Sequence, residues 1–202
     1  MDSHNLRGKC MKKVILILAL AALAVTNSFA AVKPITKSVS KMEFGVDAGV
    51  ALPLGPTHFT DNYSNGYGGG VVVRYKVCKK TSIGLAASFY SYKTQSNMGA
   101  KAPAFTSIEI LAQSKMKFGK GSVKPYLLAG LGMDLGVVGE QTGTYGYTRT
   151  GKAVTNSDFT LQPGFGVEFG QSTKFFVEVK LSVVMCKDDN TTYLPINIGL
   201  QF

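Results

Sequence analysis

The last ten residues of the chain, Tyr193 to Phe202, alternate strictly between apolar and small or polar side chains. The apolar positions are Leu194, Ile196, Ile198, Leu200 and Phe202. Successive side chains of a β-strand point to opposite faces, so this segment predicts a strand with one apolar face. A chain built from such segments must form a sheet whose apolar face is removed from water.

The same period of two recurs from Met42 onward, in segments of about ten residues separated by turn-forming stretches. We predict eight strands: Met42–Leu52, Gly69–Val77, Thr81–Tyr92, Phe105–Phe118, Val123–Val137, Ser157–Gly170, Phe175–Val184 and Tyr193–Phe202. Soluble strands usually have five or six residues, whereas a tilted membrane-spanning strand needs about 9–11. The connections alternate between long and short, as outer loops and periplasmic turns do. We therefore predict an all-β fold, an eight-stranded antiparallel up-and-down transmembrane β-barrel, over residues 42–202.

An export signal precedes the predicted barrel. From Met11 the chain has two lysines, an apolar run from Val14 to Val25, and small residues before Ala30. This pattern predicts a secretory signal peptide cleaved after Ala30, because the run is too short to cross a bilayer as a helix. Residues 1–10 form an upstream extension, and residues 31–41 form a polar lead-in.

The bulk composition narrows the class of protein. The chain has 22 Lys and Arg against 12 Asp and Glu, a net charge of +10. Removing the signal segment leaves 18 basic and 11 acidic residues, a net charge of +7. These basic residues are scattered rather than clustered, so we expect no nucleic-acid partner. The 23 glycines and 21 phenylalanines and tyrosines suit a tightly packed β-protein.

The two faces of the predicted strands are expected to meet different surroundings. A narrow lumen cannot hold the apolar face while charges meet lipid, so we expect the apolar residues to face outward. Representative lipid-facing residues are Phe44, Val46, Leu85, Ile110, Leu131, Phe165, Val179 and Ile198. The residues expected to form a lumen charge network are Glu43, Asp47, Arg74, Lys76, Glu109, Lys115, Lys117, Asp134, Glu168, Glu178 and Lys180.

The inward charges have both signs, and an eight-stranded barrel is just wide enough for side chains to fill. Buried charges need partners, so we predict a largely plugged lumen. A water-filled pore for small solutes is the alternative. A soluble lipocalin-like barrel with its apolar residues inside is the structural rival, and strand length, loop order and the export signal favour the membrane form.

Four segments carry a resemblance to a known family: Lys124–Gly132, Pro163–Phe169, Phe176–Lys180 and Pro195–Phe202. Over residues 42–202 the chain resembles the eight-stranded outer-membrane β-barrel proteins of Gram-negative bacteria, the OmpA-like and opacity-protein-like class. The resemblance implies location in the outer membrane among its lipids. It also implies that Phe202 acts as an assembly signal, read by the barrel-assembly machinery through the last strand.

The sequence contains no motif that supports a catalytic, cofactor or metal site. His58 lies in the first long connection near Thr57, Thr60 and Asp61, and we interpret it as a solvent-exposed residue. Acyl chemistry by this histidine is the alternative. The Asp188-Asp189-Asn190 run could touch a divalent cation but is typical of a solvated turn.

The outer connections carry aromatic residues in a small polar background, a composition that suits contact surfaces. The residues expected to form a loop contact surface are Tyr63, Tyr67, Tyr145, Tyr147 and Arg149. The alternative is that these residues belong to an aromatic girdle or are ordinary loop residues. An extracellular ligand or host surface is the kind of partner that this surface would take.

The cysteines test the topology. Cys78 falls at a predicted periplasmic turn and Cys186 at a predicted outer loop. A disulfide needs Cα atoms within about 7 Å, so we expect no bridge between opposite ends of a barrel.

The sequence as a whole predicts a non-enzymatic outer-membrane barrel with a structural or surface-interaction role. A solute channel and a lipid-modifying enzyme are the two alternatives.

Overall fold

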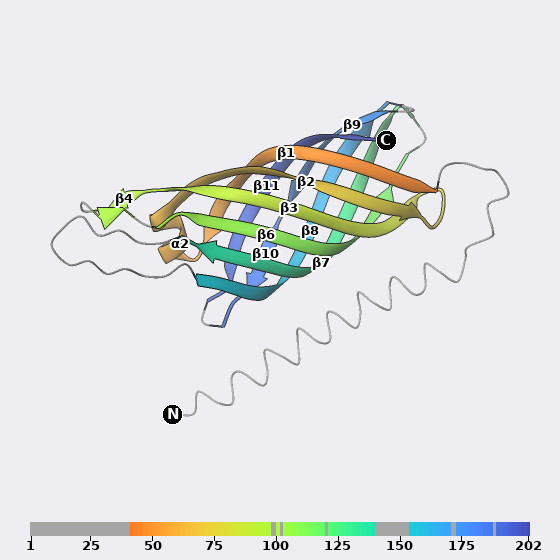
Figure 1. The fold of residues 1–202 in the computed structure, drawn as a ribbon. Coiled ribbons are helices and arrows are strands. Elements are labelled where there is room, and N and C mark those ends of the chain that lie inside the picture. Colours follow the sequence, from red (N-terminus) through yellow and green to blue (C-terminus); the bar gives the residue numbers. More distant parts are fainter. Residues whose placement is uncertain are drawn as a thin grey trace, which may run out of the picture. The chain divides into compact units, whose positions relative to one another are not determined.

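The computed structural model describes residues 41–97, 100–101, 103–119, 121–139, 154–170, 173–187 and 189–202. The predicted signal segment and nearly all of the lead-in lie outside these residues. Within them, the strands form one closed antiparallel barrel (Figure 1). Its strands are β1 (Met42–Gly55), β2 (Tyr63–Lys76), β3 (Thr81–Thr94), β6 (Phe105–Lys117), β7 (Val123–Val138), β8 (Val154–Phe169), β9 (Lys174–Lys180), β10 (Ser182–Met185) and β11 (Thr191–Gln201).

Strands β9 and β10 are two parts of one strand, so the described residues form an eight-stranded barrel, as predicted. The strand is interrupted at Leu181, whose N–H still donates to the Pro163 carbonyl at 2.8 Å. The register places Leu181 opposite Pro163 on β8 and places Lys180 opposite Pro195 on β11. Proline has no N–H to donate, so both neighbouring strands lack a ladder donor at this height.

The barrel closes where we predicted, between the first strand and the last. Antiparallel pairing of β1 with β11 runs from Gly45 opposite Gln201 to Gly55 opposite Thr192. Phe44 and Phe202 add a reciprocal pair of backbone hydrogen bonds, of 3.2 and 2.8 Å. We call the end that holds Met42 and Phe202 the terminal end, and the opposite end the α2 end.

The predicted long connection from Pro53 to Gly68 is wrong. β1 continues to Gly55, a short helix α2 (Thr57–Asn62) follows, and β2 begins at Tyr63. The start of β2 is rich in glycine, which reads as a loop in sequence. The structure gives the reason for the glycines, because a Cβ at Gly68 would collide with the Phe89 carbonyl of the neighbouring strand.

The other predicted bounds need smaller corrections. β3 extends to Thr94, and β8 begins three residues before the predicted Ser157. Part of the predicted connection 93–104 forms a small hairpin of β4 (Ser96–Asn97) and β5 (Ala100–Lys101). The strands extend beyond the predicted segments because cross-strand pairing continues past the residues whose alternation is visible.

The two faces of the barrel are sorted as predicted. The outward side chains are large and apolar, and Leu85, Phe165 and Ile198 remain 64%, 60% and 54% exposed. Most inward side chains of the same strands are charged or polar, and most of them are almost fully buried. An apolar exterior around a polar interior is the opposite of a soluble barrel, so the lipocalin-like alternative does not apply. The structure contains, among its described residues, no helix long and apolar enough to span a bilayer.

Candidate functional site

The lumen of the barrel collects the charged side chains, and β6 shows how they are ordered along its axis. Lys117 and Lys115 lie toward the terminal end, Gln113 lies midway, and Glu109 and Ser107 lie toward the α2 end. Their contacts define three groups. The basic layer is Glu43, Lys76, Lys115, Lys117, Glu168 and Lys174, the middle layer is Asp47, Arg74, Gln113, Tyr126, Glu178, Lys180 and Asn197, and the acidic layer is Ser107, Glu109, Asp134, Gln162, Ser182 and Tyr193.

The basic layer sets four lysines around two carboxylates. Glu43 Oε1 lies 2.9 Å from Lys117 Nζ, 3.3 Å from Lys174 Nζ and 3.6 Å from Lys76 Nζ. The second carboxylate, Glu168, pairs with Lys115 at 2.7 Å and with Lys117 at 3.2 Å. Both carboxylates are 1% exposed, so these lysines compensate charges that water cannot reach.

The Lys115 ammonium has the most enclosed position of the four. Besides Glu168, its Nζ donates to Gln201 Oε1 at 2.9 Å and lies 3.9 Å from the centroid of the Tyr126 ring. A hydrogen-bonded cation over an aromatic face in a water-poor space gains from both contacts. Lys115 therefore links three separate strands at the terminal end.

The middle layer is balanced in charge. The guanidinium of Arg74 donates through Nε and Nη2 to Gln113 Oε1, and Lys180 pairs with Glu178 at 2.9 Å. The Tyr126 hydroxyl donates to Glu178 at 3.0 Å. Every one of these side chains is almost fully buried, so the layer fills the lumen with satisfied polar groups.

A second chain of contacts crosses the middle layer. The Asn197 amide donates to Asp47 Oδ1 at 3.0 Å and contacts the Tyr90 hydroxyl at 2.8 Å. Asp47 is only half-buried, whereas Asn197 is fully buried. Asn197 therefore ties the last strand to the adjacent first strand and, through Tyr90, to β3.

In the acidic layer, neutral donors replace the lysines. The Tyr193 hydroxyl lies 2.9 Å from Glu109 Oε1 and 2.6 Å from Asp134 Oδ2. Ser107 Oγ donates to Asp134 Oδ2 at 2.6 Å, and Ser182 Oγ donates to Glu109 Oε1 at 2.8 Å. Gln162 Nε2 contacts both Glu109 and Ser182. The two carboxylates are thus buried among hydroxyl and amide groups.

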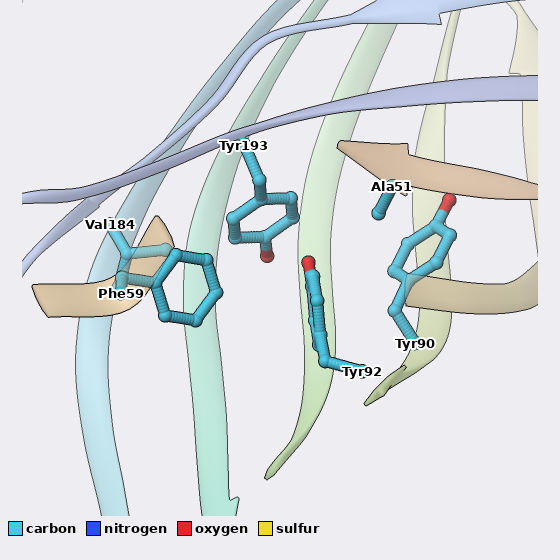
Figure 2. Packing of buried hydrophobic residues seen from close by; sticks show 6 residues of the cluster. All are labelled: Ala51, Phe59, Tyr90, Tyr92, Val184 and Tyr193. Atoms are coloured by element: carbon cyan, nitrogen blue, oxygen red, sulfur yellow. The ribbon is translucent and has the colours of Figure 1, made fainter. Parts of the chain in front are cut away.

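An aromatic cap closes the α2 end of the lumen. Phe59 of α2 is 5% exposed and packs on Tyr63, Tyr92 and Phe105, with ring centroids 5.4 Å apart in each pair. Tyr193 packs next to this cluster, with its ring centroid 5.9 Å from that of Tyr92 (Figure 2). The helix is held by hydrogen bonds from the Phe59 and Thr60 N–H groups to the Pro56 carbonyl.

The predicted charged residues all lie on inward positions of the strands. Most are buried, while Lys76 stays 29% exposed near the terminal end. The sequence did not single out Lys174, Gln162, Ser182 and Tyr193, although alternation alone assigns the last three to the inward face. Phe59 had no such signal, because it lies on a helix within a segment interpreted as a loop.

The predicted loop contact surface is only partly described. Tyr63 lies in β2 and packs into the aromatic cap, so its placement in an exposed loop is wrong. Tyr67 also lies in β2, on the outer face, with Lys93 Nζ 4.9 Å from its ring centroid. This position is that of an interfacial aromatic residue. Tyr145, Tyr147 and Arg149 lie outside the described residues.

The remaining candidates for chemistry are described only in part. His58 is exposed on α2, and Asp188 falls outside the described residues. No group of three or more His, Cys, Asp or Glu side chains placed to hold a metal occurs in the part of the chain that the structure describes.

Cys78 and Cys186 are free thiols at opposite ends of the barrel. Partial burial raises the pKa of the Cys78 thiol, but hydrogen bonds with Thr81 and Lys80 and the Lys80 charge outweigh it, so the pKa is lowered overall. Burial raises the pKa of the Cys186 thiol. At a given pH, Cys78 is therefore the more reactive of the two.

Two glycines make room for the large inward side chains. A Cβ at Gly166 would lie 2.5 Å from the Tyr126 hydroxyl oxygen and 2.6 Å from the Val177 carbonyl oxygen. A Cβ at Gly164 would lie 2.9 Å from Lys180 Cγ. Small residues on β8 thus let the tyrosine and the lysine cross the lumen.

Replacing Gly166 with alanine is expected to destabilise the barrel by about 1–3 kcal/mol, the usual cost of overpacking. The measurement is guanidinium unfolding of the refolded barrel in phospholipid vesicles. Gly55→Ala is the control, because a Cβ there meets nothing within 4 Å. Equal midpoints for the two variants would contradict the packing described for Tyr126.

A closed antiparallel barrel with an apolar exterior and a polar interior defines the class of transmembrane β-barrels. The chain belongs to the outer membrane protein beta-barrel domain family, which matches residues 15–202. Its location is therefore the bacterial outer membrane, and its surroundings are outer-membrane lipids. The resemblance noted in the sequence is confirmed.

Two solved structures share the fold, and a third aligns with a TM-score below 0.5. Neisserial surface protein A (NspA) aligns with a TM-score of 0.60 and 16% identity, over 82% of this chain and 98% of that one. OprG from Pseudomonas aeruginosa aligns with a TM-score of 0.52 and 12% identity, over 79% and 95%. Ail, the attachment invasion locus protein of Yersinia pestis, gives 0.49 and 17%, over 80% and 99%. No curated protein sequence matches the chain.

Proposed function

We propose that the protein is a non-enzymatic outer-membrane barrel whose lumen is closed to solutes and whose role is structural or surface-interacting. The observation that carries the proposal is that nearly all inward side chains of the three layers are buried and contact one another. The side chains of the basic, middle and acidic layers and of the aromatic cap occupy the space that a solute would need. The basic layer is joined by ion pairs, and the other two layers are joined largely by hydrogen bonds. An eight-stranded barrel has little room beyond its own side chains.

The α2 end is the end that we assign to the cell exterior. It carries the longer connections, and the strand count puts both ends of the barrel chain on the other, periplasmic side. The connection between β7 and β8 contains Tyr145, Tyr147 and Arg149 and is the proposed contact surface for an extracellular ligand or host surface. The chain is exported through the proposed signal peptide, which is cleaved after Ala30, and residues 31–41 form a lead-in to the barrel.

The closed lumen predicts a silent barrel in planar-bilayer recordings. The refolded protein is expected to insert without stepwise currents. Phe59→Ala is expected to be silent as well, because it opens the cap but leaves the charged layers in place. Stepwise single-channel currents from the unaltered protein would refute the closed lumen and favour the solute channel. Currents from Phe59→Ala alone would assign the closure to the cap.

A lipid-modifying enzyme is the second alternative, and His58 is its testable element. The proposal expects the lipid A of cells that express the protein to be unchanged by mass spectrometry. A modification that appears with the protein and disappears with His58→Ala would establish the enzyme instead.

Phe202 is the proposed assembly signal. Its side chain is 59% exposed on the outer face, while its backbone completes the pairing with Phe44. Phe202→Ala keeps the backbone bonds, so it is expected to reduce the amount of barrel in the outer membrane severalfold and leave refolding in detergent unchanged. Phe175→Ala, an outward aromatic on the neighbouring strand that is 44% exposed, is the matched control. Equal losses for both variants would mean that the effect comes from lost apolar surface.

A further inference from the structure

The acidic layer has a charge arrangement that the other layers lack. Glu109 on β6 lies directly opposite Asp134 on β7, and Asp134 lies directly opposite Asp158 on β8. Three inward carboxylates therefore follow one another across three adjacent strands. Like charges directly opposite in a sheet repel and destabilise it, the more so where water is excluded.

No lysine or arginine of the lumen forms an ion pair with Glu109 or Asp134 within the described residues. All the ion pairs found between described residues involve Glu43, Glu168 or Glu178. Lys180, which lies nearest along the lumen, is paired with Glu178. Glu109 is fully buried and Asp134 is 3% exposed, so solvent does not supply the missing positive charge.

The hydrogen count of the acidic layer is also short. Four close oxygen pairs join Glu109, Asp134, Ser107 and Tyr193, at 2.6, 2.6, 2.9 and 3.0 Å. With both carboxyls ionised, the two hydroxyls supply one hydrogen each, so two of the four pairs bring oxygens together with no hydrogen between them. Oxygens this close without a hydrogen need a positive charge among them.

Gln162, whose amide group reaches Glu109, carries an unpartnered acceptor. Gln162 is 1% exposed, and its amide nitrogen is held by Glu109 at 2.9 Å and by Ser182 at 2.8 Å. Its amide oxygen is buried without a hydrogen-bond partner. The Tyr92 hydroxyl is likewise buried without a partner, and it points toward the Tyr193 hydroxyl (Figure 2). Buried polar atoms without a partner are satisfied by a water or by an ion.

We propose that the acidic layer binds one hard cation of the Ca²⁺ class. The carboxylates of Glu109 and Asp134, the Ser107 hydroxyl and the Gln162 amide oxygen are its ligands, and Asp158 adds negative charge from the side. Ca²⁺ binds six to eight oxygens at roughly 2.4 Å. In a pentagonal arrangement, neighbouring oxygens at that distance are about 2.8 Å apart, and two of the proposed ligand atoms, Ser107 Oγ and Asp134 Oδ2, lie 2.6 Å apart.

The aromatic cap gives the site its route of exchange. Phe59 and Tyr92 cover the layer from the α2 end, whereas the middle and basic layers block it from the other side. An ion therefore enters past Phe59. Phe59→Ala is expected to leave the affinity within a few fold and to speed release of the ion about tenfold or more.

Terbium luminescence tests the proposal directly. Tb³⁺ replaces Ca²⁺ at oxygen sites and is excited by nearby tyrosines, and this chain has nine tyrosines and no tryptophan. Protein refolded in zwitterionic detergent, free of lipopolysaccharide, is expected to give tyrosine-sensitised emission that Ca²⁺ displaces. Glu109→Gln and Asp134→Asn are each expected to weaken binding at least tenfold. Asp189→Asn, which alters an exposed acidic residue at the same end of the barrel, is the control.

Each result decides the question. Emission that is absent, or that Ca²⁺ does not displace, overturns the proposal and leaves protons as the positive charge in the layer. If emission is lost in Asp189→Asn but kept in Glu109→Gln, the ion binds at the connection between β10 and β11, and the proposal is overturned. The variants are compared only if they show heat-modifiable gel mobility, which indicates that they have folded into a barrel. If neither lumen variant folds, Ca²⁺ must raise the melting temperature of the unaltered barrel relative to chelator, and no rise refutes the site.

Discussion

Lys115→Met lowers the free energy of unfolding of the barrel by about 3–5 kcal/mol, the expected cost of removing one partner from a buried ion pair. Methionine keeps most of the side-chain length but has no charge and no N–H donor. Glu168, which is 1% exposed, then retains only Lys117 at 3.2 Å, and the Gln201 amide oxygen loses its donor. The variant is expected to unfold at lower guanidinium concentration in phospholipid vesicles.

Two further variants separate the ion pair from a general effect of losing a lysine. Lys79→Met removes an exposed lysine at the turn between β2 and β3 and is expected to change stability by less than about 0.5 kcal/mol. Lys115→Met combined with Glu168→Gln removes both charges and is expected to recover a large part of the loss, because no buried charge is left alone. A Lys115→Met barrel as stable as the unaltered protein would show that water reaches the basic layer.

Leu131→Arg is the second large effect, expected at about 2–4 kcal/mol. Leu131 lies near the middle of β7 on the outer face and is 49% exposed. In a membrane this position faces the hydrocarbon interior, where an arginine is costly. A soluble barrel would accept the same change at an exposed position with little loss. The measurement is again guanidinium unfolding in vesicles.

The matched control for this substitution lies on the same strand. Val123 begins β7, is 53% exposed and belongs to the terminal end, near the membrane interface. Val123→Arg is expected to cost about 0–1 kcal/mol, because an arginine there reaches water. Equal costs for the two arginines would contradict the membrane placement of the outer face, since depth would then have no effect.

Alternation was sufficient to predict most of the barrel. The period of two assigned an inward or outward face to each strand residue, and the inward charges follow from it. The prediction failed where glycine replaced the pattern. The start of β2 carries glycines because neighbouring strands pass too close for a Cβ, and in sequence such a run is indistinguishable from a loop.

The sequence by itself determined the eight strands, their two faces, the closing pair of β1 and β11, and the exported, membrane-embedded character of the chain. These features follow from side-chain direction along a strand, which is local. Which inward residues meet across the lumen was decided by the tertiary structure alone. Barrel curvature and strand stagger bring Glu43 to Lys174 and Phe59 to Phe105, and they leave Glu109 and Asp134 together without a lysine. The eight-strand closure thus turned a uniform inward face into one basic and one acidic layer.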